Sequence, residues 1–426
     1  MSGFKHRLNA YLGIQCIGAL GLTNENELEF FYHESWQQTG YPLSPHLPLD
    51  NSARNNQFSI RVFFQNVFPE GENLAILLET FHLSRSNIFS ITQVLGQDLP
   101  GAMRLVLDPG ILPTDLIFRP IQASEVTERL KHESARQLMI WDGKLRLSLA
   151  GVHQKINVVV RDNSEMGFGE GALCSTHILK FERSHAKHLV LNEFSMMKLA
   201  KAVGLSVADV SLMHFGEYPA LLVKRFDREW EGDHIQRRHV IDGCQALNLL
   251  PDYKYERHLG SGRDVAHIRD GANLPALFRC CDTCSNPALA KKQLLTWVLF
   301  NVIIGNWDAH GKNLSFFVSP LGMEIAPAYD LISVRMYPEF SQEWAMALGD
   351  EFDAKSVGAF QLADFADSCE LPRSAVARIL MQLCERVARA LPRLEYNAFT
   401  LELQQSIGSQ IEYLKKQAKM ISKVML

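Results

Sequence analysis

The spacing of hydrophobic and polar positions divides the chain into parts of different character. From about residue 136 to about 232, short stretches alternate hydrophobic and polar residues, as half-buried strands do. Strands are expected at 145–149, 156–160, 174–181 and 221–226, with one amphipathic helix at 189–202. From about residue 235 to Met420 the spacing is mostly helical. The pattern therefore predicts an α+β fold in which a β-rich part precedes a mostly α-helical part.

The first hundred residues show a different pattern of hydrophobic and polar positions. The stretch 8–18 alternates as a strand pair around Gly13, 28–32 continues as a strand, and 63–79 is expected to be helical. A length of 426 residues suggests two or three domains. We therefore expect domains at 1–105, 106–232 and 233–426.

One polar loop is set between strongly hydrophobic neighbours. The run 293–304 contains no Gly or Pro and predicts a buried helix, which Gly305 and Asn306 end. After the loop, 314–318 alternates like a strand, 320–322 is a turn, and 323–326 returns as a second strand. The loop 306–313 is therefore expected to join a buried helix to a hairpin.

The residues of this loop suit phosphoryl transfer. That reaction needs one carboxylate to accept the proton of the attacking hydroxyl, and oxygen ligands to hold Mg²⁺ against the nucleotide phosphates. Asp308 fits the first role, while Asn313 and Asp330 fit the second. His310 and Lys312 are candidates for contact with the phosphates or for bracing the loop. The competing interpretation is that these residues only cap a loop, since Asp and Asn are common in turns.

A second group of candidates lies in the β-rich part. Lys180 stands among hydrophobic strand residues, where a lysine needs a partner, either a nucleotide phosphate or Glu193. A loop between two strands supplies backbone amides for phosphates, but it matches neither common glycine-rich phosphate motif. Its residues are Ala150, Gly151, Val152, His153, Gln154 and Lys155. Lys155 is either a phosphate ligand or an exposed residue at a strand end.

Composition narrows the cellular context. The formal net charge is −4, so no overall positive field draws the chain to nucleic acid. No hydrophobic run is long enough to span a bilayer, and the N-terminus lacks the hydrophobic region of a signal peptide. Eight scattered cysteines favour a reducing cytoplasm over a disulfide framework. The cysteines between Cys280 and Cys284 have no second pair at zinc-finger spacing, so structural thiols are the preferred interpretation.

Several segments together resemble the HipA family, the serine/threonine kinase toxins of bacterial toxin–antitoxin pairs. The resemblance covers most of the chain. Its segments are 64–72, 96–102, 148–155, 175–180, 223–228, 244–247, 254–256, 306–313 and 326–331. It implies a two-lobed protein-kinase-like fold and a Mg–ATP-dependent protein kinase.

The resemblance also implies residue roles. Asp308 is the expected catalytic aspartate, with His310 and Lys312 beside it in the catalytic loop. Asn313 and Asp330 are the expected Mg²⁺ ligands, and Lys180 the phosphate-binding lysine. Adenine is expected at a hinge segment, 223–228, through the backbone around Lys224, Arg225 and Phe226. Ser148 matches the serine that family members autophosphorylate, and its added negative charge would repel the nucleotide from the phosphate loop.

The family implies partners as well. These are a small DNA-binding antitoxin of the HipB type, DNA reached mainly through that antitoxin, and an aminoacyl-tRNA synthetase, glutamyl above all, as the phosphorylated target. The sequence departs from the family at Lys224, where a glutamate is usual, and at His153 and Gln154. Two alternatives stay open: a small-molecule or lipid kinase of the phosphoinositide-kinase type, and a non-catalytic regulator that binds the antitoxin.

Overall fold

The structure is a computed structural model that describes residues 4–132, 134–146, 154–162, 164–182, 186–394 and 397–425. Contacts divide the chain into two compact units, each made of separate sequence segments. Unit 1 contains Met1–Arg183, Ser211–Ile241 and Phe317–Leu321, and unit 2 contains Ser184–Val210, Asp242–Phe316 and Gly322–Leu426. The division into domains 1–105, 106–232 and 233–426 stays a prediction.

Unit 1 begins with an antiparallel sheet of order β3-β2-β1-β4. Its strands are β1 (His6–Leu12), β2 (Gln15–Leu22), β3 (Leu28–Tyr32) and β4 (Met103–Leu107). The helices between β3 and β4 are α1 (Glu34–Thr39), α2 (Gln57–Gln65), α3 (Gly71–Thr80) and α4 (Ile88–Leu95). The strand pair expected around Gly13 is confirmed, and this glycine turns the chain with a φ of 60°.

The prediction of a single helical segment at 63–79 is wrong. The stretch 63–79 is not continuous, because α2 ends at Gln65 and α3 begins only at Gly71. Pro69 lies in the gap and removes one backbone donor from any helix that would cross it. Asn56 starts α2 by accepting a hydrogen bond from the Ser59 amide at 3.1 Å.

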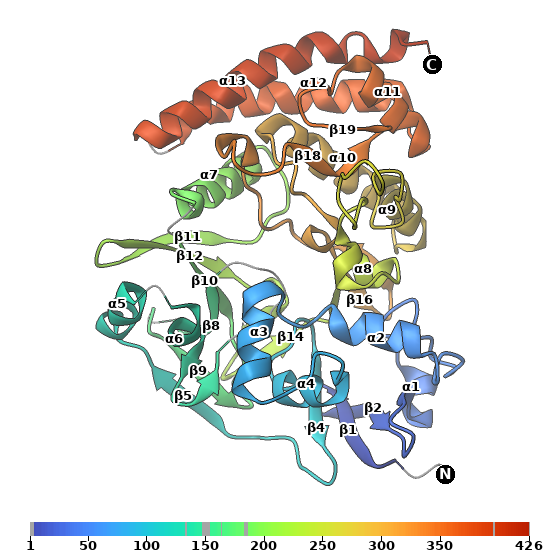
Figure 1. Cartoon of the computed structure of the whole chain (residues 1–426), viewed down its shortest axis with the longest axis vertical. Helices are drawn as coiled ribbons and strands as arrows, with labels where there is room; N and C mark the ends of the chain where they lie inside the picture. The colour runs from blue at the N-terminus through green and yellow to red at the C-terminus, as the bar shows by residue number, and fades with distance from the viewer. Residues whose placement is uncertain are drawn as a thin grey trace. The chain divides into compact units, whose positions relative to one another are not determined.

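The second sheet of unit 1 has the order β11-β12-β10-β8-β9-β5. Its strands are β5 (Leu116–Pro120), β8 (Lys155–Val160), β9 (Met166–Gly171), β10 (His177–Phe181), β11 (Val210–Phe215) and β12 (Tyr218–Lys224). Two helices, α5 (Ala123–Lys131) and α6 (Ala135–Met139), contribute to its core and appear beside it in Figure 1. Short pairs complete the unit: β6 (Ile140–Trp141) with β7 (Lys144–Leu145), and β13 (Arg228–Glu231) with β14 (His234–Arg237). Trp141, Phe168 and Leu179 are fully buried in this core.

Unit 2 is mostly helical. Its helices are α7 (Leu189–Ala202), α8 (Gly243–Ala246), α9 (Leu274–Cys280), α10 (Pro287–Ile304), α11 (Ala359–Ser368), α12 (Arg373–Ala390) and α13 (Ala398–Ala418). The two long helices α12 and α13 lie side by side (Figure 1). Its strands are β18 (Glu343–Leu348), β19 (Glu351–Asp353) and β17 (Gly322–Ile325), the last in a sheet of order β15-β16-β17 with β15 (Val240–Asp242) and β16 (Ser315–Ser319). The chain passes between the units within β15 and β16.

Helix α10 leads directly to the candidate catalytic loop. It begins six residues earlier than the sequence pattern indicates, because Asn286 accepts a hydrogen bond from the Leu289 amide and Pro287 occupies the first turn. Gly305 ends it in the left-handed conformation, with a φ of 69°. Among the residues that the structure describes, neither this helix nor any other is long and apolar enough to cross a membrane.

Candidate active site

The loop 306–313 presents one exposed residue from a buried frame. Every residue from Asn301 to Val318 is buried except Asp308. Asn306 donates a hydrogen bond to the side chain of Asn301 at 2.9 Å, and the indole of Trp307 donates to the Ser341 carbonyl at 2.7 Å. The residues on the N-terminal side of Asp308 are therefore fixed, while its own carboxylate is accessible.

Lys312 is held by the protein itself. Its ammonium group pairs with the Asp242 carboxylate, and both side chains are largely buried. Asp242 also caps α8 by accepting from the Gln245 amide at 2.8 Å. Of the two roles that the sequence left open for Lys312, this contact is the one expected of a residue that braces the loop.

Tyr329 connects the loop to the segment of Asp330. Its hydroxyl donates to the Lys312 carbonyl at 2.6 Å and accepts from the Ser315 hydroxyl at 2.7 Å. Burial raises the pKa of Tyr329, so the phenol stays protonated and keeps its donor. Asn313 and Asp330 each follow one member of this bonded pair in sequence, so the Tyr329 side chain links the segments that carry the two expected metal ligands.

The donor set suits a hard cation. Asn313 is buried, and Asp330 is half-buried with a φ of 58°, a left-handed conformation that is uncommon outside glycine. One amide oxygen and one carboxylate are ligands that Mg²⁺ accepts, with water and substrate phosphates completing its shell. No cluster of three or more His, Cys, Asp or Glu suited to a metal occurs within the described ranges, Cys280–Cys284 included.

His310 is buried and contacts an aromatic ring. The ring of Tyr255 meets it edge-on, with 5.2 Å between centroids and an interplanar angle of 88°. The hydroxyl of Tyr255 reaches the Asp308 carboxylate, donating to Oδ1 at 2.9 Å. Sequence reasoning did not assign these contacts to Tyr255, although it noted 254–256 as a family-like segment.

In unit 1, two lysines lie opposite each other on neighbouring strands. Lys180 of β10 pairs in register with Lys155 of β8, and both are largely buried. Residues directly opposite in an antiparallel pair project from the same face of the sheet. Two buried cations on one face are what a polyanionic ligand such as a triphosphate requires. Gln154 lies at the edge of the same strand, where its carbonyl accepts from the Phe181 amide at 3.0 Å.

The remaining phosphate-loop candidates lie outside the described residues. These are Ser148, Ala150, Gly151, Val152 and His153. Their expected roles as a phosphate cradle and an autophosphorylation site stay predictions.

Arg225, Asp227 and Arg228 of the hinge segment 223–228 are buried in an ion cluster. We call Arg225, Asp227, Arg228 and Asp98 the arginine cluster. Asp227 lies 2.8 Å from guanidinium nitrogens of both arginines. Burial alone would raise the pKa of Asp227, but the adjacent guanidinium groups of Arg225 and Arg228 hold it well below its usual range.

This cluster ties the hinge segment to the loop 98–101. Both arginines donate to the Leu99 carbonyl, Arg228 also donates to the Gly101 carbonyl, and Asp227 accepts the Gly101 amide at 2.8 Å. The Arg225 amide is bonded to the Thr176 carbonyl at 2.9 Å. Any contact of adenine with Arg225 would therefore use neither its side chain nor its amide. The Phe226 ring packs edge-on against Phe317, with 5.7 Å between ring centroids.

Lys224 is the exposed charge of the hinge segment. It lies in register with His177 on the neighbouring strand β10. Burial, and after it the charge of Lys224, lowers the pKa of His177 to about 4. His177 is therefore neutral at pH 7, in hydrogen-bond contact with the Thr176 hydroxyl at 2.9 Å.

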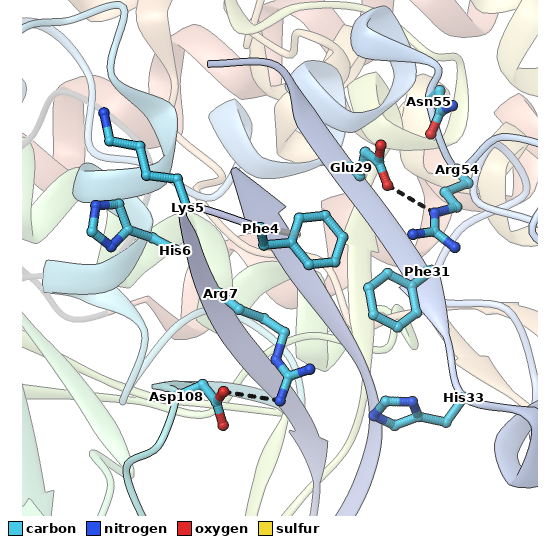
Figure 2. A pocket seen from close by; sticks show the side chains of 10 residues that line it. All are labelled: Phe4, Lys5, His6, Arg7, Glu29, Phe31, His33, Arg54, Asn55 and Asp108. Carbon is cyan, nitrogen blue, oxygen red and sulfur yellow. Dashed lines mark hydrogen bonds and ion pairs between the residues drawn. The ribbon is translucent and has the colours of Figure 1, made fainter. Parts of the chain in front are cut away.

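A separate pocket of about 970 Å³ lies on the first sheet of unit 1 (Figure 2). Two ion pairs are among the residues that line it, Arg7 with Asp108 at 3.0 Å and Arg54 with Glu29 at 2.8 Å. The Arg54 guanidinium also lies 4.7 Å from the centre of the Phe31 ring. None of the candidate residues named from the sequence lines this pocket.

Fold and site define the class of protein: an α+β, kinase-like protein with an exposed aspartate on an otherwise buried polar loop and two buried lysines on a sheet of unit 1. Two family models match the chain, the HipA N-terminal domain over residues 8–106 and the HipA-like C-terminal domain over residues 147–391. The chain belongs to the HipA family. The expectation drawn from its motifs is therefore confirmed at the level of the family.

Individual relatives agree with this assignment. The serine/threonine-protein kinase toxin HipA of Shewanella oneidensis is 45% identical over 387 residues, which is 90% of this chain and 88% of that protein. The putative kinase Y4mE of Sinorhizobium fredii is 30% identical and covers 91% of each chain. A solved complex of Shewanella oneidensis HipA, HipB and operator DNA contains a chain that matches with a TM-score of 0.90 and 40% identity, covering 98% of this chain and 100% of that one. The chain shares the serine/threonine-protein kinase class of this Shewanella relative.

Proposed function

We propose that this protein transfers the γ-phosphoryl group of Mg–ATP to serine or threonine in a protein, and that it acts as the toxin of a toxin–antitoxin pair. One observation carries the proposal: Asp308 is the single exposed residue in a stretch of eighteen whose other members are buried. A general base must reach the hydroxyl that it deprotonates, and its neighbours must hold it still. The loop meets both requirements.

Each remaining residue has a task in this reaction. Asp308 accepts the proton of the attacking hydroxyl, while Asn313 and Asp330 are suited to hold Mg²⁺. The magnesium ion, when bound, neutralises charge that develops on the phosphates. Lys180 and Lys155 of unit 1 hold the phosphates by charge, and the backbone of the hinge segment 223–228 holds adenine. Lys312 keeps the loop in place through Asp242.

The partners follow from the family. The solved Shewanella complex contains HipB and operator DNA, so we propose a HipB-type antitoxin here, with DNA reached mainly through it. The acceptor that family resemblance favours is an aminoacyl-tRNA synthetase of the glutamyl type, in the cytoplasm. Ser148 is the proposed autophosphorylation site, and phosphate there would weaken nucleotide binding by repulsion.

The intact mass of the protein as expressed tests the proposal, with peptide mapping and an Asp308→Asn variant beside it. We expect one added phosphoryl group on Ser148 in the wild type and none in the variant. If both proteins lack phosphate, labelled ATP is added, and label in an organic extract instead of protein would favour a small-molecule or lipid kinase. Label in neither fraction would overturn phosphoryl transfer altogether.

A further inference from the structure

Tyr255 contacts the candidate catalytic base directly. Its hydroxyl donates a hydrogen bond to Oδ1 of Asp308 at 2.9 Å, although the two residues are 53 positions apart in sequence. The ring of Tyr255 is half-buried and packs edge-on against the buried His310 of the same loop. The tyrosine therefore approaches Asp308 from outside the loop.

The sequence neighbours of Asp308 and Tyr255 are both hydrogen-bonded to the backbone of one residue, Ala345. Ala345 of β18 donates its amide to the carbonyl of Trp307, the residue before Asp308, at 2.8 Å. The carbonyl of Ala345 accepts the amide of Glu256, the residue after Tyr255, at 2.8 Å. A single residue of β18 therefore sets the separation of Tyr255 and Asp308.

Further bonds make the segment of Tyr255 rigid. The buried carboxylate of Glu256 accepts the Ala347 amide and the Arg269 guanidinium, both at 2.8 Å. The chain of Gly271 passes so close that a Cβ there would lie 1.9 Å from the Tyr255 carbonyl oxygen. A hydrogen bond between groups held this way loses little entropy when it forms, which is the physical meaning of preorganisation.

We infer that Tyr255 is the positioning residue of the catalytic base. Its hydroxyl holds one carboxylate oxygen of Asp308, so the other oxygen keeps a fixed direction toward the hydroxyl of the protein substrate. An exposed carboxylate would otherwise rotate about its terminal torsion, which is broad for aspartate. The inference rests on the proposed function, because it gives Asp308 the role of the base.

The test is Tyr255→Phe, which removes the hydroxyl and keeps the ring that packs on His310. The protein is first dephosphorylated, and phosphate incorporation is then measured against Mg–ATP concentration. We expect the maximal rate to fall about 10- to 100-fold, the scale of a misplaced catalytic group. The half-saturating Mg–ATP concentration should stay within about twofold, because Tyr255 contacts the proposed base and none of the residues proposed to hold the nucleotide.

Tyr253→Phe is the matched control. Tyr253 lies in the same segment, stacks on His258 with 4.0 Å between ring centroids, and makes no hydroxyl hydrogen bond to Asp308. This variant should transfer phosphate at the wild-type rate, and both variants should melt at the wild-type temperature. A common loss in both would assign Tyr255 a merely structural role and overturn the inference.

The other outcomes separate the two claims. If the wild type transfers phosphate and Tyr255→Phe does so equally fast, the positioning role is wrong while the proposed function stands. If Tyr255→Phe is faster than the wild type, the hydroxyl competes with the substrate for Asp308, and the inference is again wrong. If the wild type transfers no phosphate, the proposed function fails, and the role of Tyr255 fails with it.

Discussion

The candidate catalytic loop 306–313 and the hinge segment 223–228 contain similar charged residues, but these residues differ in their exposure. Both are rich in charge, both are mostly buried, and both match motifs of the HipA family. The loop leaves the carboxylate of Asp308 exposed, whereas the hinge segment closes Asp227 between Arg225 and Arg228. A motif therefore identifies the family, but exposure decides which of its charged residues can meet a substrate.

The energetic consequences differ in the same way. A buried ion pair gains little net stability, but removal of one partner leaves the other charge unpaired in a medium of low dielectric constant. An exposed carboxylate has no such cost, because water solvates whatever replaces it. We therefore expect loss of Asp308 to change activity and loss of Asp227 to change stability.

Asp308→Asn should have the largest effect on activity. It keeps the shape of the side chain and removes the base, so phosphoryl transfer should fall by about 100- to 10,000-fold. The free energy of unfolding should change by less than about 0.5 kcal/mol, as for other exposed positions. Rates of phosphate incorporation and thermal melting of the same samples check both statements. Normal turnover would remove Asp308 from the role of base.

Asp227→Asn should have the reverse effect. It leaves Arg225 and Arg228 with only Asp98, which is 26% exposed, so we expect a local loss of about 3–5 kcal/mol. Hydrogen exchange of the peptide 96–102 reports this loss, because Asp227 accepts the Gly101 amide. Asp98→Asn is the control, with a smaller expected loss since water reaches that carboxylate.

The stability that Asp227 contributes should decrease as the pH is lowered. The pKa of Asp227 in the folded protein is held below its usual range, so its contribution to stability is complete above about pH 4, the ordinary aspartate value. The contribution is lost as the pH falls below that value toward the folded pKa. Wild type and Asp227→Asn should therefore differ most near neutrality and converge in acid. A constant difference from pH 7 to pH 2 would contradict the ion-pair explanation.

The sequence predicted the surroundings of Asp308 better than those of Asp227, for a physical reason. The strand expected at 314–318 is observed at Ser315–Ser319, and the helix expected at 293–304 is the C-terminal part of α10. These elements are local, so periodicity reveals them. The arginine cluster depends on Asp98, which is 127 positions from Arg225, and no periodicity encodes such a contact.

The same limit explains the remaining errors and omissions. No helix was expected at 123–139, where α5 and α6 form. Their hydrophobic faces are short, and these faces can be recognised only from their packing against the second sheet of unit 1. Tyr255 carried no signal of its role, since β18, far along the sequence, brings it to Asp308. Tyr329 had a weak signal, because it directly precedes the expected metal ligand Asp330.

Lys312→Met should lower both stability and activity, whereas Asp227→Asn lowers mainly stability and Asp308→Asn mainly activity. It removes the ammonium that pairs with Asp242 and keeps most of the buried stem. We expect a loss of about 1–3 kcal/mol of stability, since Asp242 keeps its bond to the Gln245 amide, and a lower maximal rate because the loop shifts. The half-saturating Mg–ATP concentration should be unchanged, and Asp242→Asn should give the same pattern. A selective rise in that concentration for Lys312→Met alone would show that the lysine contacts phosphate.

Lys224→Glu should have the smallest effect, because it exchanges an exposed charge at the edge of the hinge segment. It restores the residue usual in the family, and the free energy of unfolding near pH 7 should change by less than about 0.5 kcal/mol. The sensitive reporter is His177, whose pKa of about 4 reflects burial first and the charge of Lys224 second. Because this pKa is lowered, protonation of His177 destabilises the fold progressively as the pH falls from about 6.5 toward 4, and has no effect above that range. Replacing the cation by an anion should raise the pKa of His177 in an NMR titration and weaken this acid sensitivity. If the backbone holds adenine, the affinity for Mg–ATP should change by less than about threefold. A larger change in affinity would mean that the Lys224 side chain itself contacts the nucleotide, and the hinge segment would then hold a functional charge as the catalytic loop does.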